Sequence, residues 1–306
     1  MSTVEDPTQV VMSRLREVPD AYRRFAAGAP EARRVFGIGA DLLAQLIDLG
    51  LPHQRRGGEL RLDAFDLENI STGLRLRSPQ AMTMRQWKHA LASRRRPGGA
   101  DCLVTVEWRC PAPGHRDGCD FALSDLFTPV SRIDEKHEPA RGSVVLQAEP
   151  SDHAIRFGAE FHPVLAAAAR LTFYKLPPQL SNDLSFVRRT GLANCRLACQ
   201  HLLDTAAAAG VNARPAAGLF LGALFPFRHI WIEVEVGGRW VAADPFFLET
   251  LRRWGVVDRP DWPADQSPRG ILWRLLNASS IDEPFVTHRG CEASVSVSAR
   301  WVPQAG

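Results

Sequence analysis

Lysine is almost missing from this chain. Of its 306 residues only Lys88, Lys136 and Lys175 are lysines, although lysine and arginine together number 37. The replacement of lysine by arginine is typical of proteins encoded by a GC-rich genome. The number of arginines is therefore weak evidence for a nucleic-acid-binding protein.

Long apolar segments are also missing. A membrane span needs about eighteen or more consecutive apolar residues, and no such run occurs. The segment from Met1 to Leu15 contains acidic side chains and no apolar run of signal-peptide length. We therefore expect a soluble, cytoplasmic protein. In a reducing compartment, six cysteines in a chain of this length indicate thiols and not a disulfide framework.

The sequence shows no internal repeats, no glycine-rich phosphate-binding loop and no acidic cluster of the calcium-binding type. We expect no cofactor. With 45% hydrophobic residues, the chain can bury a full core and is long enough for two domains. The Pro97-Gly98-Gly99 segment is a candidate linker, so we expect one domain over residues 1–97 and a second over 98–306.

Positive charge is concentrated in one segment. Residues 51–100 hold ten Arg or Lys against four Asp or Glu, whereas the net charge of the whole chain is only +3. Almost all of this basic segment belongs to the expected first domain. It is suited to contact an acidic partner.

The stretch from Gly191 to Pro245 carries the strongest functional pattern. After Cys195, apolar residues recur at helical spacing until Gly210, so Cys195 is expected in the first turn of a helix. Unpaired backbone N–H groups at a helix start favour a thiolate over a thiol. A single cysteine near a helix start is nevertheless more often a small buried residue than a nucleophile. Its position makes Cys195 a candidate nucleophile.

A hairpin follows this helix. Residues 229–236 alternate with a period of two, and Gly237-Gly238 supplies a two-residue turn before the strand 239–244. If Val236 pairs with Arg239, Trp231 lies opposite Asp244, and His229 is its diagonal neighbour on the same face. The other face is apolar and is expected to be buried; it carries Ile230, Ile232, Val234, Val241 and Ala243.

The hairpin thus places His229 and Asp244 together, away from the side that we expect to be buried. A carboxylate that is hydrogen-bonded to one imidazole nitrogen fixes the tautomer. The other nitrogen can then take a proton from a thiol and return it to a leaving group. Cys195, His229 and Asp244 are therefore a candidate catalytic triad.

This order of residues resembles a known family. Cys195, the helix that ends in Gly-Val-Asn-Ala-Arg214, His229-Ile-Trp-Ile-Glu and Trp240-Val-Ala-Ala-Asp244-Pro resemble the transglutaminase-like core of the papain-type superfamily, over about a fifth of the chain. The resemblance implies an α+β fold in which the helix that carries the cysteine packs on an antiparallel sheet. It also implies that Cys195 is the nucleophile, His229 the base and Asp244 the residue that orients the base.

The residues around the cysteine differ from the pattern of the superfamily. Members often have glycine or tryptophan there, whereas this chain has Asn194 and Arg196. We therefore expect a different acceptor side.

Candidates for stabilising an oxyanion or contacting substrate lie around the triad. The backbone N–H of Cys195 is the first candidate donor, and Gln179 or Tyr174 is a candidate for the second. Trp231 is a further candidate for substrate contact. The alternative is that Gln179 has no catalytic role, as is usual for a glutamine in a proline-rich surface loop.

Four residues near the expected domain boundary form a weaker candidate site. Cys102, Cys110, His115 and Cys119 supply three sulfurs and one nitrogen, which is a ligand set of structural zinc sites. Their spacing lacks the Cys-x2-Cys pair that would make the prediction strong. Buried or solvent-facing thiols without metal are the alternative.

The N-terminal residues 8–48 repeat apolar positions every three or four residues, with breaks near Pro19 and Pro30, and predict helices. A small hairpin from His53 to Leu62 is expected around Gly57-Gly58, and a helix is expected to begin at Asp63.

Over residues 40–70 this pattern resembles the winged helix of the MerR and excisionase-type DNA-binding families. Arg55 and Arg56 on the wing would suit contacts to phosphate. The alternative is a unit that packs or binds protein. The low net charge of the chain favours a carrier protein or a peptide over DNA.

The expected reaction is acyl transfer through a thioester on the enzyme. As the resemblance implies, relatives include transglutaminases, peptidases, leader peptidases of lasso-peptide pathways and amide synthases of natural-product assembly. We favour an acyltransferase that forms an amide bond between an acyl group on an acyl or peptidyl carrier protein and an amine acceptor. The alternatives are a cysteine peptidase that cleaves a leader peptide, and a DNA-binding regulator with an inactive triad domain.

Overall fold

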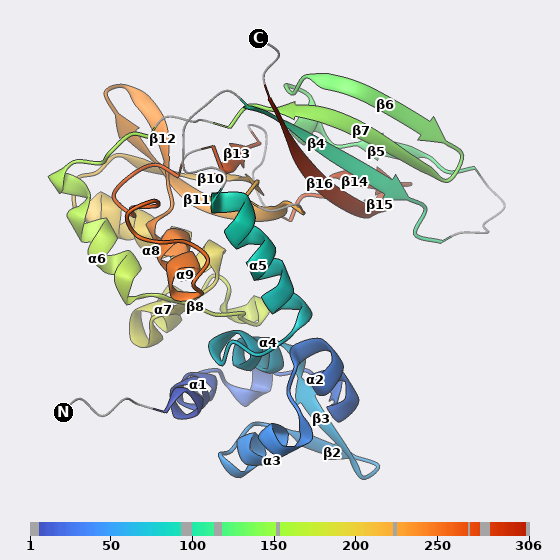
Figure 1. Ribbon diagram of the computed structural model, residues 1–306, viewed down its shortest axis with the longest axis vertical. Helices are drawn as coiled ribbons and strands as arrows, with labels where there is room; N and C mark the ends of the chain where they lie inside the picture. The colour runs from blue at the N-terminus through green and yellow to red at the C-terminus, as the bar shows by residue number, and fades with distance from the viewer. Residues whose placement is uncertain are drawn as a thin grey trace.

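The computed structural model describes residues 6–92, 100–112, 118–150, 154–222, 225–268, 270–275 and 282–303. Helices and strands are mixed along the chain, as the α+β prediction requires. Figure 1 shows a helical N-terminal part, a central layer in which helices pack on one sheet, and a second sheet to which the C-terminal strand returns. The expected linker at 97–99 and the candidate ligand His115 lie outside the described residues.

Four helices surround a small antiparallel sheet in the N-terminal part. The helices are α1 (Pro7–Arg16), α2 (Ala29–Phe36), α3 (Ala40–Asp48) and α4 (Ala64–Gly73). The strands, in spatial order, are β1 (Phe25–Gly28), β3 (Glu59–Asp63) and β2 (Gln54–Arg56).

The predicted hairpin is present between β2 and β3. Gly57 and Gly58 form its turn with positive φ angles of 58° and 82°, which suit a tight two-residue hairpin turn. Asp63 then caps α4, because its Oδ1 accepts hydrogen bonds from the amides of Phe65 (2.8 Å) and Asp66 (3.2 Å).

The prediction of a helix over residues 21–27 is wrong. A single 3-10 turn, Asp20–Tyr22, is followed after Arg23 and Arg24 by β1, in which Ala27 pairs with Leu62. The helical spacing of apolar residues is overridden here by pairing with β3 and by burial of the Arg23 side chain.

Arg23 makes a buried ion pair. Its Nε donates to Asp66 Oδ2 at 2.6 Å, and the two side chains are only 1% and 4% exposed. The guanidinium also donates to the backbone carbonyls of Val18 (2.7 Å) and Leu15 (2.6 Å). Burial raises the pKa of Asp66 to about 6, although Arg23 opposes the shift. This arginine thus ties three segments of the N-terminal part together.

We predict that Arg23→Met lowers the free energy of unfolding by about 3–5 kcal/mol, because it leaves the Asp66 carboxylate buried without its partner. Without Arg23 the folded-state pKa of Asp66 rises further. A raised folded-state pKa stabilises at low pH and loses that effect as the pH rises, so the loss should be larger at pH 8 than at pH 5. Urea unfolding at both pH values measures this difference.

Arg61→Met is the matched control for this prediction. Arg61 pairs with Glu59 at 2.6 Å on the surface, and such pairs contribute about 0–1 kcal/mol. Equal losses of the free energy of unfolding in the two variants would show that the buried pair contributes no more than a surface pair.

The central sheet has the antiparallel order β12-β11-β10-β13. Its strands are β10 (Ala213–Phe220), β11 (Phe227–Val236), β12 (Arg239–Ala243) and β13 (Leu272–Arg274). Helix α8 (Cys195–Ala208) packs on one face, with α6 (His162–Arg170) and α7 (Leu184–Thr190) behind it. This arrangement agrees with the predicted cysteine-bearing helix on an antiparallel sheet.

The other face of this sheet is covered as well. Side chains of α5 (Pro79–Ala92) and α9 (Pro245–Arg253) form an aromatic cluster with it that includes Phe220, Trp231 and Phe247. The expectation that His229 and Asp244 lie on an unburied side is therefore wrong. The strand alternation predicts which residues share a face, but not that a second layer covers it.

A separate sheet forms the third part, with the order β16-β4-β7-β6. Its strands are β4 (Ala100–Arg109), β6 (Arg132–Glu138), β7 (Arg141–Ala148) and β16 (Ser294–Pro303). A three-stranded sheet lies next to it, made of β5 (Phe121–Leu123), β14 (Val286–His288) and β15 (Cys291–Glu292). The C-terminal strand β16 thus pairs with β4, the first strand after residue 100.

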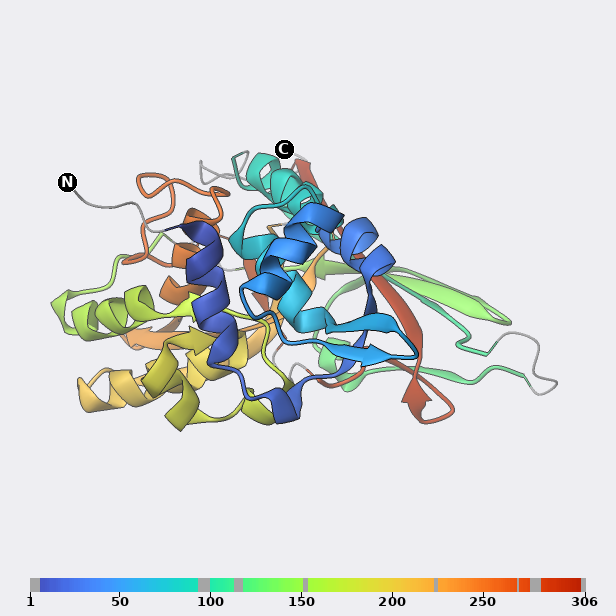
Figure 2. The same cartoon turned by 90° about the horizontal axis from the view of Figure 1, so that it is seen from below.

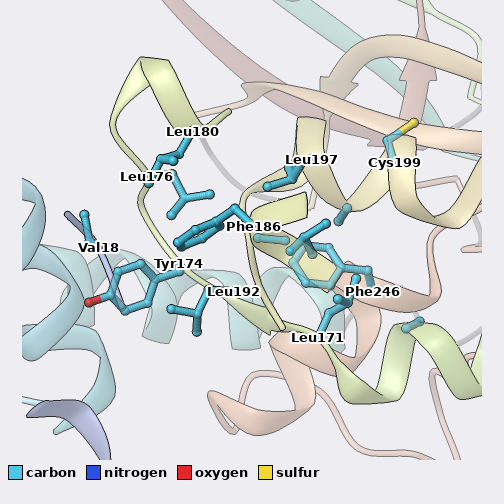
Figure 3. Close-up of a cluster of buried hydrophobic side chains, with 14 of the residues drawn as sticks. Val18, Leu171, Tyr174, Leu176, Leu180, Phe186, Leu192, Leu197, Cys199 and Phe246 are labelled. Carbon is cyan, nitrogen blue, oxygen red and sulfur yellow. The ribbon is translucent and has the colours of Figure 1, made fainter. Parts of the chain in front are cut away.

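The N-terminal part packs directly on the segment that precedes α8. The side-chain amide of Asn69 donates to the carbonyl of Lys175 (3.0 Å) and accepts from its amide (2.8 Å). Lys175 follows β8 (Thr172–Phe173), which pairs in parallel with β9 (Leu192–Ala193) just before α8. Figure 3 shows Val18 and Tyr174 at one end of a buried cluster that continues to Leu197 and Phe246. Figure 2, in which the molecule is seen from below, shows α1 lying across the helices of the central layer.

Within the described residues, no helix combines the length and apolar character that a membrane span requires.

Candidate active site

The first turn of α8 is fixed by Asn194. Its Oδ1 accepts the amide of Leu197 (2.9 Å), and its Nδ2 donates to Ser181 Oγ (3.0 Å). This arrangement is a regular N-terminal cap and keeps the helix start in one place. Cys195 is the first residue of the helix and is half-buried.

The β11–β12 hairpin has the predicted register. Val236 pairs with Arg239 and Ile232 with Ala243, so Trp231 and Asp244 follow at the end of the ladder. His229 Nε2 lies 2.5 Å from Asp244 Oδ2, and the two residues are 1% and 6% exposed. The hairpin therefore forms the imidazole–carboxylate pair in a buried site.

Cys195 completes this group. Its sulfur is hydrogen-bonded to the His229 side chain and accepts a hydrogen bond from the backbone amide of Ile230. Because Nε2 is engaged by Asp244, Nδ1 is the imidazole nitrogen that is left for the thiol. The structure brings Cys195, His229 and Asp244 into one hydrogen-bonded chain. The contact of the Ile230 amide was not predicted.

The pKa values of Cys195 and His229 shift in opposite directions. Burial alone would raise the pKa of the Cys195 thiol, but the hydrogen bond and charge of His229 and the amide of Ile230 outweigh it and lower the pKa. Burial alone would lower the pKa of His229, but the Asp244 carboxylate raises it to about 10. Both shifts favour the thiolate–imidazolium pair over the neutral thiol and imidazole.

Asp244 has a second structural role. Its Oδ1 accepts the amide of Phe247 (3.1 Å) and caps α9, which has Pro245 at its first position. The sequence does carry a signal for this cap, because an aspartate followed by proline is a favourable helix start. One carboxylate therefore both orients the imidazole and begins a helix.

Aromatic rings enclose His229. The ring of Phe247 lies 4.6 Å from the imidazole, centroid to centroid, and that of Trp231 lies 6.1 Å away in a stacked orientation. Trp231 is itself buried and also lines a pocket with Glu233 and Trp240. The predicted substrate contact of Trp231 stays a prediction; in this structure its ring packs against the base.

Of the two predicted oxyanion side chains, Tyr174 is in the wrong place. It is buried, and Figure 3 shows its hydroxyl directed toward Val18 of the N-terminal part, on the far side of the cluster from α8. Burial raises its pKa well above the usual value, and the charge of Asp66 adds to the shift. Asn69 holds the backbone at the next residue, Lys175, and the Tyr174 hydroxyl lies on the side of the N-terminal part.

Gln179 is exposed in a 3-10 turn, Pro178–Leu180, and its role as a donor stays a prediction. The turn leads into Ser181, the partner of Asn194. The amide of Cys195, at the start of α8, is positioned by the helix itself.

Cys199 lies one turn further along α8 and has a different environment. Its thiol donates to the carbonyl of Trp231 (3.2 Å), and burial raises its pKa. Figure 3 shows its sulfur facing the sheet. Cys199 is thus a protonated packing residue and a natural comparison for Cys195.

The predicted zinc ligands are only partly brought together. Cys110 and Cys119 lie next to each other, whereas Cys102 is buried in β4, where it pairs with Ala148 and Trp301. A strand rises about 3.3 Å per residue, so Cys102 is too far along β4 to share a metal with Cys110. That part of the prediction is wrong, and His288 takes a place that the sequence did not suggest.

We predict that Cys195 is alkylated by iodoacetamide much faster than glutathione below pH 7. The lowered pKa of Cys195 keeps its thiolate populated at pH values where an ordinary thiol is protonated. Rates between pH 5 and pH 9, followed by intact-protein mass spectrometry, check this. A profile that rises only near the pKa of glutathione would contradict the thiolate–imidazolium pair.

Comparisons with known proteins give little to add to this geometry. No protein-family model matches the chain, and no curated protein matches its sequence. Among solved structures, the chain is similar to one described as a "Putative Cysteine Protease from Cytophaga hutchinsonii". The two share 11% sequence identity with a TM-score of 0.34, over 69% of this chain and 95% of that one.

Proposed function

We propose that this protein is a cysteine-dependent acyltransferase that forms an amide bond through an acyl-thioester on Cys195. The observation that carries the proposal is the hydrogen-bonded chain from Cys195 through His229 to Asp244, with the pKa of the thiol lowered. A half-buried thiolate beside an imidazolium is suited to attack an activated carbonyl.

The reaction follows from the positions of these groups. The Cys195 thiolate attacks the carbonyl carbon of a thioester donor, and the amide of Cys195 stabilises the oxyanion that forms. The tetrahedral intermediate collapses, and the leaving thiolate takes a proton from His229. An amine then attacks the acyl-enzyme and gives its proton to His229, and the Cys195 thiolate leaves as the amide forms. Asp244 holds the imidazole in place throughout.

Two neighbouring clefts support an acidic carrier protein as the donor. One is lined by Arg14, Arg75, Lys175 and Arg253, where the N-terminal part meets β8 and α9. The next is lined by Arg75, Arg85 and Lys88. Glu68 pairs with Lys175 at 3.4 Å and Glu249 pairs with Arg253 at 3.3 Å, but the four basic residues of the first cleft outnumber these two carboxylates. Such a surface favours encounter with an acidic partner. We place this activity in the cytoplasm, in natural-product biosynthesis.

The order of elements in the N-terminal part supports a role in holding that partner. Strand β1, helices α2 and α3 and the β2–β3 hairpin follow one another as in a helix-and-wing unit, and we propose that this winged-helix-like unit binds protein and not DNA.

A peptidase is the second candidate, since water can replace the amine in the second step. Strand β2 is exposed along its whole length at the edge of its sheet. A peptide could add there as a further strand, as in other peptide-recognition domains.

Intact-protein mass spectrometry after incubation with acyl-carrier thioesters or short peptides tests the proposal. A stoichiometric acyl adduct that is discharged by added amine, with release of the amide, is the expected result. If peptides are cleaved and thioesters give no acyl adduct, the peptidase is favoured. Failure of every donor, together with slow alkylation of Cys195, would rule out the cysteine enzyme.

A further inference from the structure

A second group of chemically active side chains lies outside the triad. The ligand atoms of Cys110, Cys119 and His288 all lie within 4.8 Å of one another. Cys110 Sγ is 3.9 Å from His288 Nε2, although 178 positions separate these two residues in the sequence. The function proposed above makes no use of this group.

The fold holds the three residues from two sides. Cys110 follows the last residue of β4, and its amide donates to the carbonyl of Ala140 (2.8 Å). His288 ends β14, directly opposite Cys291 of β15. The turn between them, Arg289-Gly290, has positive φ angles of 50° and 79°, which suit a tight two-residue hairpin.

Arg289 fastens the hairpin to the loop that carries Cys119. Its amide donates to the carbonyl of Asp120 (3.0 Å), and its guanidinium donates to the carbonyl of Gly118 (2.6 Å). The two segments are thus joined by hydrogen bonds from Arg289 to the backbone carbonyls on both sides of Cys119. The ligand atoms converge without any rearrangement of the backbone.

The spacing of the ligand atoms suits a tetrahedral metal. With Zn–S near 2.3 Å and Zn–N near 2.0 Å, neighbouring ligand atoms lie about 3.5–3.8 Å apart. The 3.9 Å between Cys110 and His288 is close to this value. A shift of roughly 1 Å, within reach of a side-chain rotation, brings the widest pair into the same range.

Burial and charge also suit a metal. Cys110 and His288 are 8% and 6% exposed, and the ring of Phe121 lies 4.9 Å from the His288 ring. The charge of Arg289 acts on the Cys119 thiol. Three thiolates and a neutral imidazole around Zn²⁺ would carry a net charge of −1, which this arginine offsets.

We propose that Cys110, Cys119 and His288 bind a structural zinc ion, with Cys291 as the fourth ligand. Directly opposite residues of a hairpin have Cβ atoms about 4.5–5.5 Å apart, so the Cys291 thiol reaches the ion by rotating its side chain. The ion joins the end of β4 to the β14–β15 hairpin and binds independently of the active site.

The test is the zinc content of the full chain, purified under reducing conditions and measured by elemental analysis. We expect one zinc per chain in the wild type and below about a tenth of that in Cys110→Ser, Cys119→Ser and His288→Gln. Substitution with Co²⁺ should give the thiolate charge-transfer and tetrahedral absorption bands. Cys291→Ser should change these bands and weaken binding.

Cys102→Ala is the matched control, because Cys102 lies in β4, the strand that leads to Cys110, but away from the cluster. It should keep its zinc. If the ligand variants do not fold, alkylation of the native wild type gives the answer: Cys110 and Cys119 should be protected until a chelator is added. Absence of zinc and of Co²⁺ binding in the wild type, or a Cys110–Cys119 disulfide in its place, would overturn the proposal.

Discussion

The Cys195→Ala variant is expected to form no acyl adduct and to lose turnover by roughly six orders of magnitude, to below detection. We expect Cys199, the next thiol on α8, not to replace the proposed nucleophile, because its thiol is hydrogen-bonded to the carbonyl of Trp231 and its pKa is raised. The measurement is single-turnover acylation with the best thioester donor, followed by intact-protein mass spectrometry.

Cys199→Ala is the control for this variant. It removes a thiol from the same helix, one turn away, and should keep adduct formation at the wild-type rate. Both variants introduce alanine, the best helix former, so their circular dichroism spectra should match the wild type. Residual adduct on Cys195→Ala, or loss of activity in both variants, would contradict the assigned nucleophile.

The Asp244→Asn variant separates the catalytic role of this residue from its structural one. The asparagine side chain can still cap α9 through its oxygen, so the free energy of unfolding should change by less than about 1 kcal/mol. Its amide would then donate to His229 Nε2, which forces the proton onto Nδ1, the nitrogen that faces Cys195. An imidazole in this tautomer cannot accept the thiol proton, and we expect turnover to fall by about four orders of magnitude.

Two readouts distinguish this effect from a general structural defect. The pH profile of Cys195 alkylation should move upward toward that of an ordinary thiol, since the imidazolium is no longer stabilised. Asp244→Ala should show the same profile but a further loss of stability of about 1 kcal/mol, because it removes the helix cap. An Asp244→Asn variant with an unchanged alkylation profile would show that the carboxylate does not orient the base.

The pairing of His229 with Asp244 could be predicted because local sequence sets it. The Gly237-Gly238 turn fixes the register, and alternation then puts both residues on one face. The cap of α8 is also local, since Asn194 and the residues it contacts lie close together along the chain. By contrast, the contact of the Ile230 amide with the thiol depends on how α8 packs on the sheet.

Other elements could not be predicted because they also depend on contacts between segments that are distant in the sequence. Strand β6 is exposed throughout and rich in charge, and the sequence there predicts an irregular loop. Its pairing with β7 determines its structure, and charged side chains are usual on such an edge strand. Likewise the apolar residues of Leu272–Arg274 by themselves are as typical of a helix as of a strand, and they form a strand because they pair with β10.

His288 shows the limit most clearly. Cysteine spacing alone suggests ligands within one segment, whereas the chain returns to Cys110 only after forming the whole central layer. A histidine at a hairpin end has no local feature that distinguishes it from a packing residue.

The shared role of Asp244 has a consequence for the newly made chain. Synthesis reaches Cys195 well before Asp244, and the carboxylate takes its place only when α9 begins to form. Until then His229 lacks the partner that raises its pKa, and the cysteine behaves as a common, slow-reacting thiol. We therefore expect the Cys195 thiol to become reactive only in molecules in which α9 has formed.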